Sequence, residues 1–137
     1  MKNKARGYTE LKIGGQTREL RFRGNEIAML EERLDMGISQ IMSPDRMGLR
    51  ILREAILVGV AHEFQGKKGK DARLSPQKIS RWIDQYGDEG GDLGELMKVV
   101  YEAIALGLPG GDKMMEDEDE DEEGGEGEDN PLEIVAS

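Results

Sequence analysis

Four carboxylates near the C-terminus stand at the spacing of a calcium-binding loop. They occupy positions 1, 3, 5 and 12 of such a loop and belong to Asp117, Asp119, Asp121 and Glu128. Position 6 of that loop needs a glycine for its sharp turn, and the chain has Glu122 there. A run of alternating Asp and Glu also reaches this spacing by composition alone. We therefore expect loose condensation of divalent cations on this segment, with no resident metal or cofactor.

The other polar residues that could do chemistry lack the partners they need. His62 is the only histidine, and one histidine beside Glu63 makes neither a catalytic triad nor a three-ligand metal site. No strand precedes the glycines that might suggest a phosphate loop, and no Gly-Lys-Ser/Thr sequence follows them; they are Gly87, Gly90, Gly91 and Gly94. The chain contains no cysteine and so has no thiol nucleophile. The sequence predicts a protein that is not an enzyme.

Two small basic clusters could contact phosphates of nucleic acid. One is the loop with Lys67, Lys68 and Lys70, and the other is the N-terminal set Lys2, Lys4 and Arg6. The clusters are short, and a large excess of acidic residues in the same chain would compete for the same cations. We interpret them as solubilising segments and expect no nucleic acid partner, but keep a small nucleic-acid-associated regulator or adaptor as the alternative.

Methionines are frequent in one region of the chain. Flexible, polarizable thioethers suit either an irregular core or a surface that adapts to varied apolar partners. Both interpretations stay open, and the candidate partner-binding residues are Met29, Met36, Met42 and Met47.

The net charge of −10 is unevenly distributed. Residues 1–112 carry 18 Lys and Arg against 17 Asp and Glu, a net charge of +1, whereas residues 113–137 carry one Lys against 12 acids, a net charge of −11. Dense like charge repels itself and buries nothing, so the sequence predicts a disordered acidic tail. The expected organisation is a flexible basic N-terminus (1–7), a folded domain (8–112) and this tail (113–137). The closing apolar residues are either a remnant or a docking segment; they are Leu132, Ile134 and Val135.

Length and composition also predict where the protein works. The length suits a single domain, and the absence of cysteine fits a reducing compartment. The positively charged start lacks the apolar stretch of a signal peptide, and no window is long and apolar enough for a membrane span. We expect a cytoplasmic protein without a membrane partner.

The folded domain is expected to open with a β-hairpin. Residues 8–13 and 16–22 both alternate apolar and polar positions, and Gly14-Gly15 between them suits a two-residue turn. Two strands alone are only marginally stable, so their apolar face must pack on helices. The inward-facing residues should be Leu11, Ile13, Leu20 and Phe22.

Helices should follow the hairpin. The first is predicted at residues 26–34, with Asn25 as N-cap, Gly37 as its stop and a stripe of Ile27, Leu30 and Leu34. A turn is expected through residues 38–42. Ser43-Pro44 then predicts the start of a helix to about residue 64, and its all-apolar segment 56–61 marks that helix as central.

Two more helix starts are expected further along. Ser75-Pro76 begins a helix that ends at Gly87 and carries a stripe of Ile79, Trp82, Ile83 and Tyr86. Asp92 with Glu95 approximates a capping box for a last helix through Leu106, whose buried face should contain Leu93, Leu96, Met97, Val100 and Ile104. The expected fold class is α+β, mainly α: a hairpin followed by about four helices in a small bundle.

The order of these elements resembles the tail assembly chaperones of long-tailed bacteriophages and gene transfer agents. The resemblance covers residues 8–111 and rests on element order and apolar spacing. Its parts are the hairpin with its Gly-Gly turn, Ile27-Ala-Met-Leu-Glu-Glu-Arg-Leu34, the apolar helix from Leu49 to Phe64, Ile79-Ser-Arg-Trp-Ile-Asp84, and a Leu-x-x-Leu-Met helix ending near Gly107-Leu-Pro-Gly-Gly111.

The resemblance implies a virion assembly factor in the cytoplasm of an infected host cell. Proteins of this family hold the long tape measure protein soluble and help recruit tail tube subunits around it. Those two proteins are therefore the expected partners, and self-association is left open. The acidic tail has no counterpart in the family, and we expect it to act as a solubiliser by charge repulsion.

Overall fold

The structure, a computed structural model, describes residues 8–69 and 73–110. It begins with the antiparallel strands β1 (Tyr8–Ile13) and β2 (Gln16–Arg21). The helices that follow are α1 (Gly24–Leu34), α2 (Ile38–Ile41), α3 (Leu49–Val60), the 3-10 helix η1 (Ala61–Phe64), α4 (Pro76–Asp88) and α5 (Leu93–Gly107). The predicted class, a hairpin followed by a mainly helical bundle, is confirmed. The additional helix is α2, a single turn where only a turn was expected.

The β-hairpin forms for the reason that its sequence suggests. Ile13 pairs with Gln16 across a two-residue turn, and Gly14 and Gly15 take φ values of 67° and 84°, a region that glycine enters at little cost. The four predicted inward residues are all buried: Leu11, Ile13, Leu20 and Phe22.

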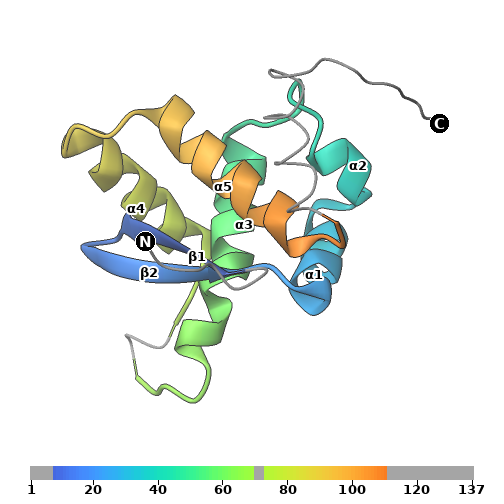
Figure 1. Cartoon of the computed structure of the whole chain (residues 1–137). Helices are drawn as coiled ribbons and strands as arrows, with labels where there is room; N and C mark the ends of the chain where they lie inside the picture. The colour runs from blue at the N-terminus through green and yellow to red at the C-terminus, as the bar shows by residue number, and fades with distance from the viewer. Residues whose placement is uncertain (1–7, 70–72, 111–137) are drawn as a thin grey trace.

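Helix α3 is the centre of the molecule. It packs against β2, α1, α4 and α5, and Figure 1 shows the other helices arranged around it. Every residue from Ala55 to Val60 is buried, which confirms the prediction of a helix surrounded on all sides. Gly59 allows the hairpin to approach, because a Cβ there would lie 2.8 Å from Phe22 Cζ.

Two predicted helix starts are wrong. The α3 helix begins at Leu49, with Gly48 extended before it, because Ser43 accepts a turn hydrogen bond from Arg46 N (2.9 Å) and the chain around Pro44 is a turn. The helix therefore starts five residues after the predicted proline, and its last predicted turn is the 3-10 segment η1.

The α1 helix is also bounded differently from the prediction. It starts at Gly24, and the Glu26 carboxylate accepts from the backbone N–H of Arg23 (3.0 Å), so Asn25 is inside the helix and is not its N-cap. The helix ends because Asp35 turns into the left-handed region at φ 55°, before Gly37 is reached.

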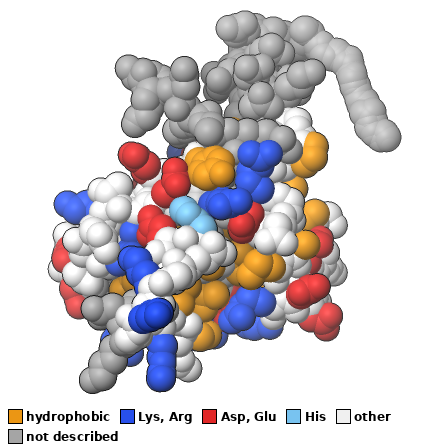
Figure 2. All heavy atoms as spheres, turned by 90° about the horizontal axis from the view of Figure 1, so that it is seen from below, with side chains coloured by type: hydrophobic (Ala, Val, Ile, Leu, Met, Phe, Trp, Pro, Cys, Tyr) orange, Lys and Arg blue, Asp and Glu red, His pale blue; other side chains and the backbone are white. Residues whose placement is uncertain are grey.

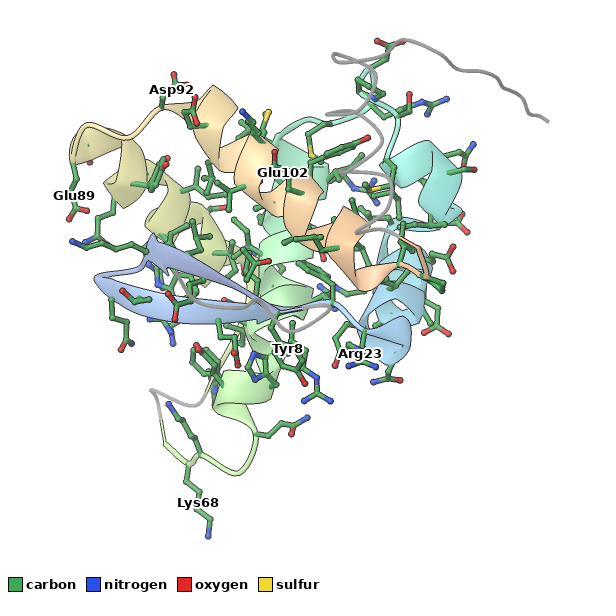
Figure 3. All side chains as sticks on the ribbon, in the orientation of Figure 1. Tyr8, Arg23, Lys68, Glu89, Asp92 and Glu102 are labelled. Atoms are coloured by element: carbon green, nitrogen blue, oxygen red, sulfur yellow. The ribbon has the colours of Figure 1, made fainter. Side chains whose placement is uncertain are left out.

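The starts of α4 and α5 were predicted correctly. Ser75 Oγ accepts from Lys78 N at 3.2 Å and Asp92 Oδ2 accepts from Glu95 N at 3.1 Å. Figure 3 shows Asp92 at the beginning of α5. The α4 helix continues one residue past Gly87, and Leu93, expected in the core, is 41% exposed.

Several sequence predictions concern residues outside the described ranges. They are the calcium-like spacing of residues 117–128, the basic N-terminus 1–7, Lys70 and the acidic tail. Within the described ranges, no helix is both long and apolar enough to cross a membrane.

Candidate functional site

The four candidate methionines do not form one surface. Met29 lies on α1, is 38% exposed, and its sulfur accepts a 3.8 Å hydrogen bond from Asn25 Nδ2. Met36, Met42 and Met47 are half-buried and pack against the core. The structure thus supports the core-filling interpretation for three of them in part, and leaves each with some exposed surface.

Met47 lines an apolar hollow between the segment before α3 and the helix α5. The hollow has a volume of about 330 Å³, and five other residues line it: Pro44, Gly94, Met97, Lys98 and Tyr101. The α5 residues are spaced i, i+3, i+4 and i+7, so they share one helix face. Two thioethers, a proline and a tyrosine ring make an adaptable apolar floor, and Lys98 is the charged residue in its lining. We call this the Met47–Met97 hollow.

A second, shallower hollow lies between α1 and α2 and contains Met36. Its lining is acidic and polar, because Glu31, Glu32 and Asp35 contribute to it. Met36 and Met47 are therefore parts of two different surfaces, and only the one at Met47 is apolar enough to hold an apolar partner.

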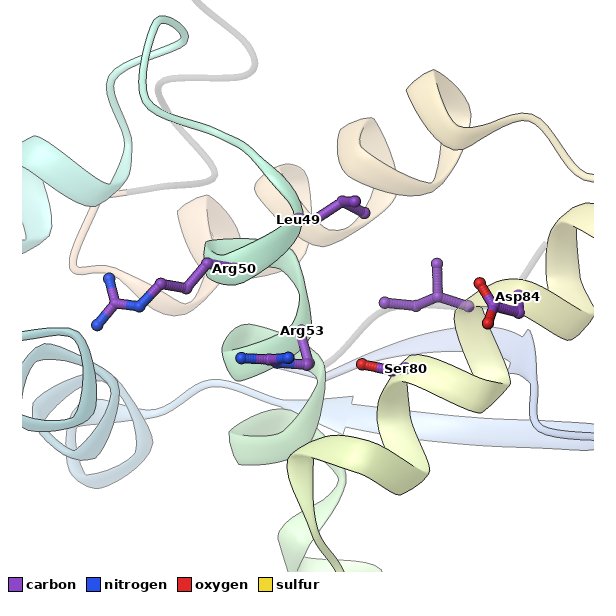
Figure 4. A pocket seen from close by; sticks show the side chains of 6 residues that line it. Leu49, Arg50, Arg53, Ser80 and Asp84 are labelled. Carbon is purple, nitrogen blue, oxygen red and sulfur yellow. The ribbon is translucent and has the colours of Figure 1, made fainter.

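A third hollow, of about 220 Å³, lies between α3 and α4. Leu49, Arg50 and Arg53 line it from α3, and Ser80, Ile83 and Asp84 line it from α4. Figure 4 shows Arg53 and Ser80 facing each other across it, while the Arg50 side chain points away. Leu49 is 58% exposed at its edge, and the buried Arg53 Nε has no hydrogen-bond partner.

His62 and Glu63 hold the outer edge of β2. His62 Nε2 lies 2.8 Å from the backbone carbonyl of Glu19, and Glu63 Oε2 accepts from the backbone N–H of the same residue at 2.8 Å. Both outward-facing backbone groups of Glu19 are therefore occupied by side chains, which prevents another strand from pairing at this position. This contact gives the single histidine a structural role.

Arg18 connects the hairpin turn to α4. Its side chain donates to Ile13 O at 3.0 Å and to Gly14 O at 3.3 Å, and it lies 3.5 Å from Glu63 Oε1. The guanidinium carbon is 4.0 Å from the centroid of the Trp82 ring, a cation–π geometry. Sequence reasoning missed Arg18, although its alternation with Leu20 and Phe22 places it on the inward face.

The basic loop gathers around a second aromatic ring. Lys67 Nζ and Lys78 Nζ lie 5.2 Å and 5.3 Å from the centroid of the Phe64 ring, which is itself 6.3 Å from that of Trp82. Figure 3 shows Lys68 at the far end of this loop, away from the helices. Among residues 8–69 and 73–110, no group of three or more His, Cys, Asp or Glu could hold a metal ion.

Comparisons of the chain with protein-family models, curated proteins and solved structures give no match. The Met47–Met97 hollow is the candidate functional site, because it alone among the three hollows combines an apolar floor with adaptable side chains. The sequence signal for it was the i, i+3, i+4, i+7 face of α5, but the contribution of Pro44 and Met47 depends on tertiary contact.

Proposed function

We propose that this chain is a tail assembly chaperone of a long-tailed bacteriophage or gene transfer agent. It binds the tape measure protein, keeps it soluble and helps recruit tail tube subunits during virion assembly in the host cytoplasm. The order of hairpin, short helix, central helix and two closing helices supports the proposal. The observation that carries it is the Met47–Met97 hollow, which offers an apolar docking place on the helical body.

A helical client would bind this hollow through the apolar stripe of one of its faces. Helix-in-groove recognition uses apolar side chains spaced by one helical turn, and thioethers adjust to side chains of different shape. Lys98 would pair with an acidic residue next to that stripe. One hollow of about 330 Å³ accepts only a few side chains, so a long client would need several copies of the chaperone along its length.

Co-expression with the tape measure protein encoded in the same genome tests the proposal. We expect the soluble fraction of the tape measure protein to rise several-fold with this chain, and to fall back when Met97→Glu places a charge in the hollow. The matched control is Met29→Glu, which puts the same charge on an exposed methionine outside the hollow. Circular dichroism of both variants confirms that they fold.

Equal recovery of the tape measure protein with and without this chain would refute the proposed function. Equal recovery with Met97→Glu and Met29→Glu would leave the chaperone activity in place but would move the client site away from the hollow.

A further inference from the structure

The surface around Phe64 concentrates positive charge. We define the Phe64 basic surface by Phe64, Lys67, Lys68, Arg73 and Lys78. Two ammonium groups lie close to the Phe64 ring, and Lys78 Nζ also donates to the carbonyl oxygen of Arg73 at 2.9 Å, which brings Arg73 into the same cluster. Figure 2 shows the molecule from below, the side toward which the 65–69 loop extends, with Lys and Arg side chains projecting from the surface.

These cations lack acidic partners within the described part of the chain. Between Gln65 and Ile83, the described residues include five Lys and Arg and no Asp or Glu. The nearest sequence neighbour with a carboxylate, Glu63, is already bound to Arg18 and to the backbone N–H of Glu19. None of the described ion pairs involves a cation of the Phe64 basic surface. Like charges gathered without a counter-charge repel one another, and an anion bound there would relieve that repulsion.

The geometry also prepares this surface to bind an anion. The cation–π contacts with Phe64 restrict the Lys67 and Lys78 side chains, so less side-chain entropy is lost when an anion binds. The N-terminus of α4, at Pro76, adds the positive end of a 13-residue helix dipole beside Lys78.

We propose that the acidic stretch of this same chain, residues 116–129, binds the Phe64 basic surface. This stretch begins with eight consecutive carboxylates, residues 116–123, and the 25 residues from 113 onward carry a net charge of −11. Its charge is therefore complementary to that of the surface. An attached anion also acts at an effective concentration on the order of millimolar, which favours it over a free polyanion.

The linker is long enough for this contact. The 19 residues from Gly111 to Asp129 can span about 60 Å when extended. A domain of about 100 residues has a radius of gyration of about 13 Å, so this length reaches any point on its surface. The bound stretch would compete with nucleic acid for the same cations. The inference does not depend on the client of the Met47–Met97 hollow.

Energy transfer within the full-length chain tests the inference. The chain has one tryptophan, Trp82, whose ring lies beside Phe64, and no cysteine, so Gly125→Cys allows a single acceptor dye in the acidic stretch. We expect strong transfer from Trp82 at about 0.01 M NaCl and at least a two-fold lower efficiency at about 1 M, because the Debye length contracts from about 30 Å to about 3 Å.

A pair of charge-reversal variants locates the contact. Lys67→Glu with Lys68→Glu should remove the low-salt excess of transfer. Lys12→Glu with Lys98→Glu makes the same change in net charge at exposed cations on β1 and α5 and should preserve it. Equal transfer in the two double variants would overturn the proposal. Transfer that ignores salt but is lost in Leu132→Ser with Ile134→Ser would also overturn it, and would assign the contact to the apolar end of the chain.

Binding of a single-stranded oligonucleotide provides a second readout. Replacing the acids of residues 116–129 by Asn and Gln should increase binding of the oligonucleotide at low salt at least ten-fold, because the cations become accessible. Equal binding by the native and the neutralised chain would show that the acidic stretch does not occupy the surface.

Discussion

The Arg18 side chain lies on the inward face of β2 with Leu20, and it is 8% exposed. Burying a charge is costly unless it is paired and hydrogen-bonded. Arg18 meets that condition with two backbone carbonyls at the hairpin turn, one carboxylate and the face of Trp82. The guanidinium thereby connects three elements that hydrophobic contact alone would leave less well defined, namely the hairpin, η1 and α4.

At the residue scale, Gly107 sets the closest approach in the fold. A Cβ at this position would overlap the backbone carbonyl oxygen of Phe22, and a backbone atom cannot move aside as a side-chain end can. We expect Gly107→Ala to lower the free energy of unfolding by about 1–3 kcal/mol, the usual cost of overpacking. Urea unfolding followed by circular dichroism measures the change.

Gly87→Ala is the matched control for Gly107→Ala. Gly87 is also helical, and a Cβ there meets nothing within 4 Å. Alanine should stabilise α4 at this position by up to about 1 kcal/mol, because it restricts the unfolded chain more than glycine does. If both variants shift the urea midpoint in the same direction, the contact of Gly107 with Phe22 does not limit the packing of α5.

At the element scale, the start of α4 depends on Ser75. Its hydroxyl accepts from Lys78 N, and Pro76 occupies the first helical position. We expect Ser75→Ala to destabilise the protein by about 1 kcal/mol and Ser75→Asp to restore the loss, because an aspartate oxygen caps equally well. Thermal unfolding of the two variants side by side checks this. A loss shared by alanine and aspartate would mean that the hydroxyl packs rather than caps.

Local signals explain which elements could be predicted from the sequence. The hairpin turn and the caps at Ser75 and Asp92 depend on neighbouring residues, and they were predicted correctly. The start of α3 was not, because Ser43-Pro44 satisfies the same rule as Ser75-Pro76 but forms a turn that packs beside α5. At α1, the Glu26 side chain caps the backbone in place of Asn25.

The candidate site was only partly predictable for the same reason. Met47 was selected from the density of methionines, but its partners Met97 and Tyr101 are more than 40 residues later in the chain. No spacing rule connects a loop to a distant helix face. The predicted grouping of Met47 with Met29 and Met36 follows sequence proximity, whereas the structure assigns Met36 to an acidic hollow and Met29 to the exposed face of α1.

At the scale of the whole molecule, charge and fold occupy different parts of the chain. Residues 1–112 have a net charge of +1, and the remaining 25 residues have −11. A nearly neutral body has little electrostatic protection against association, whereas a net charge of −10 on each copy makes copies repel one another. This repulsion persists when the acidic stretch binds the Phe64 basic surface, because binding within one chain leaves its net charge unchanged.

Neutralising the acidic tail should therefore change how copies of the whole protein interact. With the 12 acids of residues 113–137 replaced by Asn and Gln, the net charge becomes about +2, and the second virial coefficient from light scattering should fall from positive to near zero or below at about 0.02 M NaCl. In the native chain, salt should lower the coefficient because screening removes the repulsion. Replacing Leu132, Ile134 and Val135 by serine keeps the charge and should keep the native value at low salt. Equal coefficients for the native and neutralised chains would show that the body is protected by its own surface, and that the acidic residues serve another purpose.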